Sequence, residues 1–214
     1  MSDLTITYHG HALFVIETSK GVKIGTDPYN EQIKDVLPDI SADMVTSSHD
    51  HFDHANISLF KGNPTVVDQP GQTIVGEIEF DGIPSFHDEK GGSLRGPNII
   101  YKIMADNMVI THLGDLGHMP DQGLIEKLRN TDILLIPVGG VYTINSAQAV
   151  ELIDQIRPKI AVPMHYKEKD SKLDVDGIST FTRRVDDFNE VGHSFSINKN
   201  SLPASTEIRV MASS

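Results

Sequence analysis

His49-Asp50-His51-Phe52-Asp53-His54 is the stretch of sequence on which the fold assignment depends. It follows the short apolar run Met44–Thr46 and places three imidazoles and two carboxylates within six residues. In an extended chain, the side chains at positions 49, 51 and 53 share one side, whereas in a helical turn 49 stands over 53 and 51 over 54. A loop that passes from one conformation to the other presents one pair to each of two ions. Because imidazoles and carboxylates bind Zn, Mn or Fe, the hexapeptide predicts a divalent-metal site.

The side chains at positions 49, 51, 53 and 54 do not complete two coordination spheres, so further ligands must come from elsewhere in the chain. Candidates stand at the ends of three later strand-like runs, namely His87, Asp115 and His165. Strand ends converge on one edge of a sheet. A single histidine at a strand end is more often structural than a ligand, which is the alternative for His87 and His165 taken one at a time. The hexapeptide lacks such an alternative, because packing so many titratable groups together gains no stability without an ion.

The composition excludes several other kinds of site. The chain has 214 residues and no cysteine, which excludes disulfides, thiolate nucleophiles and cysteine-bound metals. A net charge of −12 disfavours a general nucleic-acid binder. There is no signal-peptide pattern and no apolar run near the ~20 residues of a membrane span, which predicts a cytoplasmic protein without a membrane partner. The length and the lack of a linker predict a single domain over residues 1–214.

The apolar pattern differs between the two halves of the chain. Short alternating or apolar runs typical of strands fill the first half, at 4–8, 13–17, 22–26, 44–46, 65–67, 72–75, 77–80, 98–104 and 108–112. The second half predicts helices at 120–129, at 146–156 and from the residue after 177–179 to about 191, which alternate with strands at 132–137, 159–163, 193–198 and 207–211. The segment 55–60 is also expected to be helical. This order predicts two packed sheets with helices outside them.

The hexapeptide matches the His-x-His-x-Asp-His motif of the metallo-β-lactamase superfamily, and the three later candidates follow in the order that this superfamily uses. Further segments resemble its ascorbate-6-phosphate-lactonase-like branch of zinc-dependent hydrolases, at 8–14, 26–28, 86–88, 112–115, 138–140, 142–143 and 163–166. The resemblance implies an α/β fold, a four-layer αββα sandwich with two divalent ions at one sheet edge, Zn being preferred over Mn or Fe. It assigns His49, His51 and His87 to one ion. It assigns Asp53, His54 and His165 to the other, with Asp115 as the bridge.

A site of this kind predicts a hydrolase. Two ions about 3.5–4 Å apart can hold both the attacking and the leaving oxygen, and each lowers the pKa of bound water toward ~7. Two dications with the carboxylates of Asp53 and Asp115 leave a charge of roughly +2, which attracts a small anionic substrate although the chain is acidic. The expected reaction is the attack of water on an ester, lactone or phosphodiester, with Asp53 orienting the water and accepting its proton.

Other residues are candidates for supporting roles. Asp27 could accept a hydrogen bond from a ligand imidazole, with a plain Asp-Pro turn as the alternative. His11 and His112 are candidates for the same role, and a structural role is their alternative. Arg95 and His118 are candidates for binding a substrate phosphate or carboxylate. Their alternatives are a surface arginine and a histidine at the start of a helix.

Two other functions are open on the same fold. One is an iron-dependent redox enzyme, although the di-iron branch tends to carry glutamate where this chain has His51. The other is a non-catalytic metal-binding module. Exposed sheet edges and the acidic surface also leave association into a homo-oligomer open.

Overall fold

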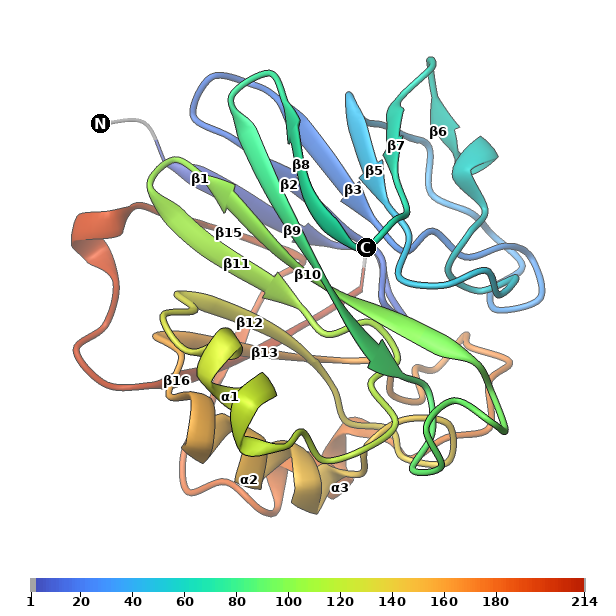
Figure 1. Ribbon diagram of the computed structural model, residues 1–214, viewed down its shortest axis with the longest axis vertical. Helices are drawn as coiled ribbons and strands as arrows, with labels where there is room; N and C mark the ends of the chain where they lie inside the picture. Colours follow the sequence, from blue (N-terminus) through green and yellow to red (C-terminus); the bar gives the residue numbers. More distant parts are fainter. Residues whose placement is uncertain (1–2, 214) are drawn as a thin grey trace.

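Two β-sheets packed face to face form the centre of the molecule (Figure 1). The computed structural model describes residues 3–213. The first sheet has six strands in the order β15-β1-β2-β3-β5-β7. These strands are β1 (Leu4–Tyr8), β2 (Phe14–Glu17), β3 (Lys23–Thr26), β5 (Met44–Thr46), β7 (Thr65–Val67) and β15 (Ser194–Ile197). Because β3, β5 and β7 are parallel neighbours, their carboxyl ends lie at the same edge of the sheet.

The second sheet has eight strands in the order β14-β16-β13-β12-β11-β10-β9-β8. Its strands are β8 (Gly71–Val75), β9 (Ile78–Phe86), β10 (Pro97–Ala105), β11 (Met108–His112), β12 (Ile133–Pro137), β13 (Ile160–Met164), β14 (Asn189–Val191) and β16 (Glu207–Met211). Strands β11, β12 and β13 are parallel, and β9 runs in their direction because β10 is antiparallel to both of its neighbours. The carboxyl ends of β9, β11 and β13 therefore share one edge.

Burial along the strands follows their place in the sandwich. Leu4, Ile6 and Tyr8 of β1 are buried and alternate with half-buried threonines, as expected for a strand with one face on the core. All of β12 is buried, because the other sheet covers one of its faces and helices cover the other (Figure 1). One apolar cluster joins both sheets and the helices. The strand ends that carry polar side chains are thus held by a rigid core.

Three helices, α1 (Gln122–Leu128), α2 (Ser146–Ile156) and α3 (Ile178–Thr182), cover the outer face of the second sheet (Figure 1). The bounds of α2 match the predicted 146–156, because local signals fix both ends. The Asn145 side chain accepts hydrogen bonds from the N–H groups of Ala147 and Gln148. The Gln148 side-chain oxygen accepts one from the backbone N–H of Asn145. None of the helices within residues 3–213 has the length and apolarity to span a bilayer.

The predicted αββα layering is confirmed, with one difference in the layer outside the first sheet. That layer is an irregular segment with two short parallel strands, β4 (Ile40–Ser41) and β6 (Phe60–Lys61), and a 3-10 turn at Ile57–Leu59. No α-helix lies in this layer among the described residues. Tyr29 and Ile33 belong to a second apolar cluster that packs this segment against the sheet.

Two helix predictions are wrong in part. The helix predicted to follow 177–179 and to end near 191 instead covers Ile178–Thr182, and Asn189–Val191 forms β14, which pairs with β16 at the sheet edge. Pairing with a strand that is distant in sequence outweighs the weak helical pattern there. In the predicted segment 55–60 the only helical structure is the 3-10 turn, because Phe60 enters β6. The strands at 98–104 and 108–112 are confirmed as neighbours, and Asp106 and Asn107 turn between them with φ values of 49° and 61°.

Candidate metal centre

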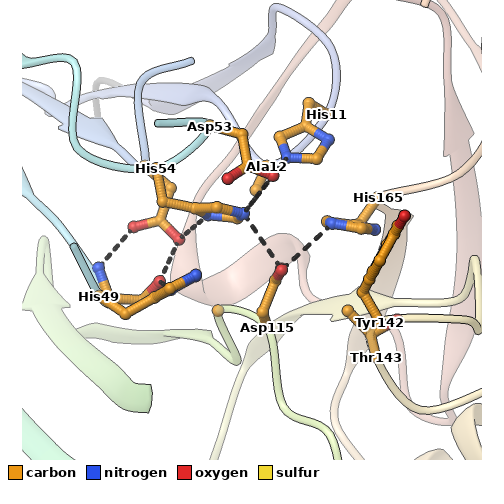
Figure 2. Close-up of polar contacts among 12 residues, drawn as sticks. His11, Ala12, His49, Asp53, His54, Asp115, Tyr142, Thr143 and His165 are labelled. Carbon is orange, nitrogen blue, oxygen red and sulfur yellow. Dashed lines mark hydrogen bonds and ion pairs between the residues drawn. The ribbon is translucent and has the colours of Figure 1, made fainter. Parts of the chain in front are cut away.

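The strand ends bring the predicted ligands together at one edge of the sandwich. The hexapeptide follows β5, His87 follows β9, Asp115 lies three residues beyond β11, and His165 follows β13. The hexapeptide itself is a turn, in which the N–H groups of His54 and Ala55 both bond to the His51 carbonyl at 2.9 and 3.0 Å. Residues separated by more than one hundred positions in the sequence thus face a common point (Figure 2).

His49, His51 and His87 form the first group of donors. One ring nitrogen from each lies within 4.8 Å of the other two. Their ring centroids are 4.5 Å apart for the pair 49 and 51, 4.7 Å for 49 and 87, and 5.2 Å for 51 and 87. The resemblance to the superfamily assigned these three side chains to one ion, and their arrangement is compatible with that assignment.

The second group contains Asp53, His54 and His165 together with His11, whose donor atoms also lie within 4.8 Å of one another. The sequence predicts a supporting role behind a ligand for His11, whereas its Nε2 lies 3.2 Å from both Asp53 Oδ2 and His54 Nε2. Its ring centroid is 4.3 Å from that of His165. The signal that could have found it is its position just after β1, where another strand ends.

Asp115 lies between the two groups. Its Oδ1 is 3.2 Å from His54 Nε2, and its Oδ2 is 3.2 Å from Nε2 of both His87 and His165. The backbone N–H of Asp115 donates to Asn98 Oδ1 at 2.9 Å, which fixes the start of the side chain. The two oxygens of one carboxylate therefore face imidazoles of both groups, as a bridge between two ions would require.

The unpaired atoms in this cluster fit a cation. Among residues 3–213, the buried atoms without a hydrogen-bond partner include His49 Nε2, Asp115 Oδ1 and both ring nitrogens of His165. Asp115 Oδ1 and His165 Nε2 each have a neighbour at 3.2 Å, but not in hydrogen-bonding geometry. Buried polar atoms are rarely left unpaired, because doing so costs about 1–3 kcal/mol each. Nitrogen and oxygen donors about 3.3 Å apart suit a tetrahedral ion with bonds near 2.0–2.1 Å.

Outer contacts hold three of the candidate ligands by the nitrogen that faces away from the cluster. His54 Nδ1 bonds to Asp27 Oδ2 at 2.8 Å, and His87 Nδ1 bonds to the Tyr142 carbonyl at 3.1 Å. His49 Nδ1 lies 2.9 Å from Ser48 Oγ, which in turn donates to Asp27 at 2.6 Å. Such contacts fix the tautomer and leave Nε2 free to bind a metal. The sequence predicts this role for Asp27, but no local pattern marks Ser48 or the Tyr142 carbonyl.

The charges of the cluster favour a bound cation. Burial alone would raise the pKa of Asp115, but the imidazoles of His165 and His54 hold it well below its usual range. Burial lowers the pKa of His49 to about 3 and that of His11 to about 4, so both rings are neutral at pH 7. Burial would also lower the pKa of His54, but Asp115 and Asp53 raise it well above its usual value. A positive charge beside these carboxylates is stabilised, whether a proton or a metal ion supplies it.

His112 lies behind the cluster and connects two of its loops. Its Nε2 bonds to the Ala12 carbonyl at 2.9 Å, and its Nδ1 accepts the N–H of Gly114 at 3.0 Å. Ala12 directly follows His11 in the chain, and Gly114 directly precedes Asp115. His112 contacts no candidate ligand through a hydrogen bond in the described structure, so it holds backbone rather than an imidazole.

The two predicted substrate contacts are both engaged with backbone. His118 bonds through Nδ1 to the Met119 carbonyl at 3.0 Å and through Nε2 to the N–H of Phe86 at 3.3 Å. These bonds occupy both nitrogens, so the geometry gives no support to an anion contact at His118. Arg95 donates through Nη2 to the Val141 carbonyl at 3.2 Å and keeps other N–H groups at the surface. Its role as a substrate contact stays a prediction.

The profile of the family described as "Beta-lactamase superfamily domain" matches residues 5–165, which is more than half of the chain. The chain belongs to the metallo-β-lactamase superfamily. Its relatives in this superfamily include a UPF0173 metal-dependent hydrolase of Thermoplasma volcanium, 31% identical over 197 residues, with 78% of this chain and 86% of the relative covered. A UPF0173 protein of Pyrococcus abyssi is 36% identical over 184 residues, covering 76% and 83%. The chain is therefore an enzyme of a family of metal-dependent hydrolases.

Two solved structures share the fold of this chain. A Thermotoga maritima protein of this superfamily superposes with a TM-score of 0.81 at 35% identity, covering 97% of this chain and 98% of that one. Igni18, a metallo hydrolase from Ignicoccus hospitalis, shares the fold with a TM-score of 0.68 at 22% identity, covering 99% and 96%. The likeness to the ascorbate-6-phosphate-lactonase-like branch is finer than these matches and stays a prediction.

Proposed function

We propose that this chain hydrolyses an ester, lactone or phosphodiester of a small anionic molecule at a centre of two divalent ions. The observation that carries the proposal is the place of Asp115 between the two groups of donors, with one oxygen 3.2 Å from His54 and the other 3.2 Å from His87 and His165. A single-ion site would need only one of these groups. The ten histidines of the chain supply enough imidazoles for both.

His49, His51 and His87 would hold one ion, and Asp53, His54 and His165 the other. Zinc is the proposed metal, because the donors are nitrogen and oxygen without thiolate, and Mn or Fe would accept the same donors. When bound, the ions supply a water nucleophile at neutral pH and stabilise negative charge on the substrate oxygen. His11, with Nε2 3.2 Å from Asp53 and His54, adds a neutral imidazole to the second group.

Asp53 is the proposed catalytic residue. Burial alone would raise its pKa, but the imidazoles of His54 and His11 lower it strongly, so the carboxylate is ionised at neutral pH. One of its oxygens, Oδ2, is 3.2 Å from His11 Nε2, and the side chain is buried, with 10% of its surface exposed. An ionised carboxylate at this position can orient a water molecule and accept its proton during attack.

The test is metal analysis combined with two substitutions in untagged protein. Wild-type protein should contain about two equivalents of metal and should cleave at least one of a generic phosphodiester, lactone or thioester. Asp115→Asn and His54→Ala should each lose metal and turnover while circular dichroism shows a folded chain. His193→Ala removes an exposed histidine outside the cluster and is the matched control, with both properties retained.

Three outcomes would contradict the proposal. Full activity of the metal-free protein would exclude the two-ion mechanism. Iron absorption bands in protein purified without air, together with no hydrolysis of any substrate class, would favour the redox alternative. Negligible rates with every substrate class and every metal, in protein that binds two equivalents, would favour a non-catalytic binding module.

A further inference from the structure

The loop after β12 contains a strained turn beside the metal centre. The Gly140 carbonyl accepts the N–H of Tyr142 at 2.6 Å, a bond across only one residue, and that residue is Val141 with φ of 58°. Positive φ is unfavourable for a β-branched residue, because its branched side chain crowds the backbone. The Val141 side chain is nevertheless 63% exposed, so burial of the side chain does not compensate for the strain. Strain that the fold maintains in this way is concentrated at functional sites.

This turn is tied directly to a candidate metal ligand. The carbonyl of Tyr142 accepts His87 Nδ1–H at 3.1 Å, so the residue that follows Val141 orients the imidazole. Figure 2 shows the Tyr142 side chain extending past Asp115 in the direction of His165. A substrate bound at the two groups of metal-donor side chains would therefore lie next to this turn.

Arg95 holds the turn from its other side. Its Nη2 donates to the Val141 carbonyl at 3.2 Å, and its guanidinium carbon lies 5.6 Å from the centre of the Tyr142 ring. Arg95 is itself fixed by Asp88, whose carboxylate accepts the backbone N–H of Arg95 at 2.8 Å and those of three other residues in the same loop, Lys90, Gly92 and Leu94. Arg95 therefore holds the turn in place by contacts with both Val141 and Tyr142.

Apolar side chains are exposed on both loops. Val141 and Leu94 are 63% and 62% exposed, and Tyr142 is 37% exposed with one ring face toward Arg95. Isolated apolar residues on a surface need no explanation, but these belong to two loops that are bonded to each other and to His87. An apolar surface that borders a polar catalytic centre suits a ligand with both kinds of group.

We propose that Val141 and Tyr142 bind the apolar chain of an amphiphilic substrate whose anionic head is held at the metal centre. The substrate class is thus an ester, lactone or phosphodiester that carries an alkyl or acyl chain of several carbons. This inference rests on the proposed function and narrows its substrate. It also gives the strain at Val141 a purpose, because a glycine there would relieve the strain but present no side chain to the substrate.

The experiment measures the binding of alkylphosphonates, from methylphosphonate to octylphosphonate, to zinc-loaded protein by isothermal titration calorimetry. With wild-type protein, affinity should rise about two- to fourfold for each added methylene over the first several carbons, as burial of apolar surface predicts. Val141→Gly should reduce this gain per methylene while leaving methylphosphonate affinity within about twofold. Its melting temperature should stay the same or rise, because positive φ favours glycine.

Val36→Gly is the matched control, because Val36 is 82% exposed and lies on a different loop. It should keep the wild-type dependence on chain length. If methylphosphonate binds but wild-type affinity does not depend on chain length, or if Val141→Gly keeps the full dependence, the substrate inference is overturned and the proposed hydrolase function stands. If no member of the series binds to zinc-loaded protein, the substrate inference is overturned, and the metal content and turnover of the protein decide separately whether the proposed hydrolase function stands.

Discussion

Replacing Asp27 with asparagine is expected to weaken metal binding through His54. Both carboxylate oxygens of Asp27 accept obligatory donors, because Oδ1 takes the N–H of Ser48 at 2.8 Å and Oδ2 takes His54 Nδ1–H at 2.8 Å. An asparagine has one acceptor oxygen and one amide nitrogen in their place. Either the Ser48 N–H loses its acceptor, or the His54 ring takes its other tautomer. In the second case Nε2 carries a proton and can no longer bind a metal.

The size of the effect follows from these contacts. One buried donor without a partner costs about 1–3 kcal/mol. Loss of an outer partner of a metal-bound histidine typically weakens metal affinity by about 10–100-fold, which corresponds to about 1.4–2.7 kcal/mol. The two estimates agree, so we expect Asp27→Asn to raise the zinc dissociation constant by about 10–100-fold. Competition with a fluorescent zinc chelator at pH 7 measures this constant directly.

Asp43→Asn is the control for this measurement. Asp43 Oδ2 also accepts a backbone N–H, that of Lys23 at 2.8 Å, but it does so at the surface and away from the metal centre. The control should bind zinc as the wild type does. An Asp27→Asn protein that folds and binds zinc with unchanged affinity would refute the role assigned to Asp27 in orienting His54.

Three further predictions concern the loops and the metal. A Cβ added at Gly139 would clash with the backbone carbonyl of His165, so Gly139→Ala should release zinc. The control is Gly123→Ala, at an open position of α1. It should bind zinc normally and unfold at the same or a slightly higher temperature. Asp88→Ala leaves four backbone N–H groups of its loop without their acceptor, and trypsin should then cut that loop about tenfold faster, while Glu89→Ala should not change the rate. At a free zinc concentration about 100 times the zinc dissociation constant, zinc binding stabilises the fold by about 2.7 kcal/mol. Removing this zinc with a chelator should therefore lower the melting temperature by about 5–10 °C. An unchanged melting temperature would mean that zinc binds the unfolded chain equally well.

Much of the secondary structure could be predicted because its causes are local. The bounds of α2 follow from the Asn145 cap and the proline after its end, both of which are visible in the sequence. The strand Asn189–Val191 could not be predicted, because its support is pairing with β16 at the edge of the sheet, which the local sequence does not show. The layer outside the first sheet could not be predicted for the same reason. It is held by apolar contacts of Tyr29 and Ile33 with distant strands rather than by a helical pattern.

The sequence by itself determined the chemistry of the centre: a hexapeptide rich in histidine and aspartate, no cysteine in the chain, and further imidazoles at later strand ends. Only the tertiary structure decided which of these groups lie together and which neighbours orient them. It brought His11 into the second donor group, connected Asp27 to His49 through Ser48, and set the Tyr142 carbonyl against His87. The physical reason is that side-chain chemistry is a property of each residue, whereas the direction of a lone pair depends on contacts between strands far apart in the chain.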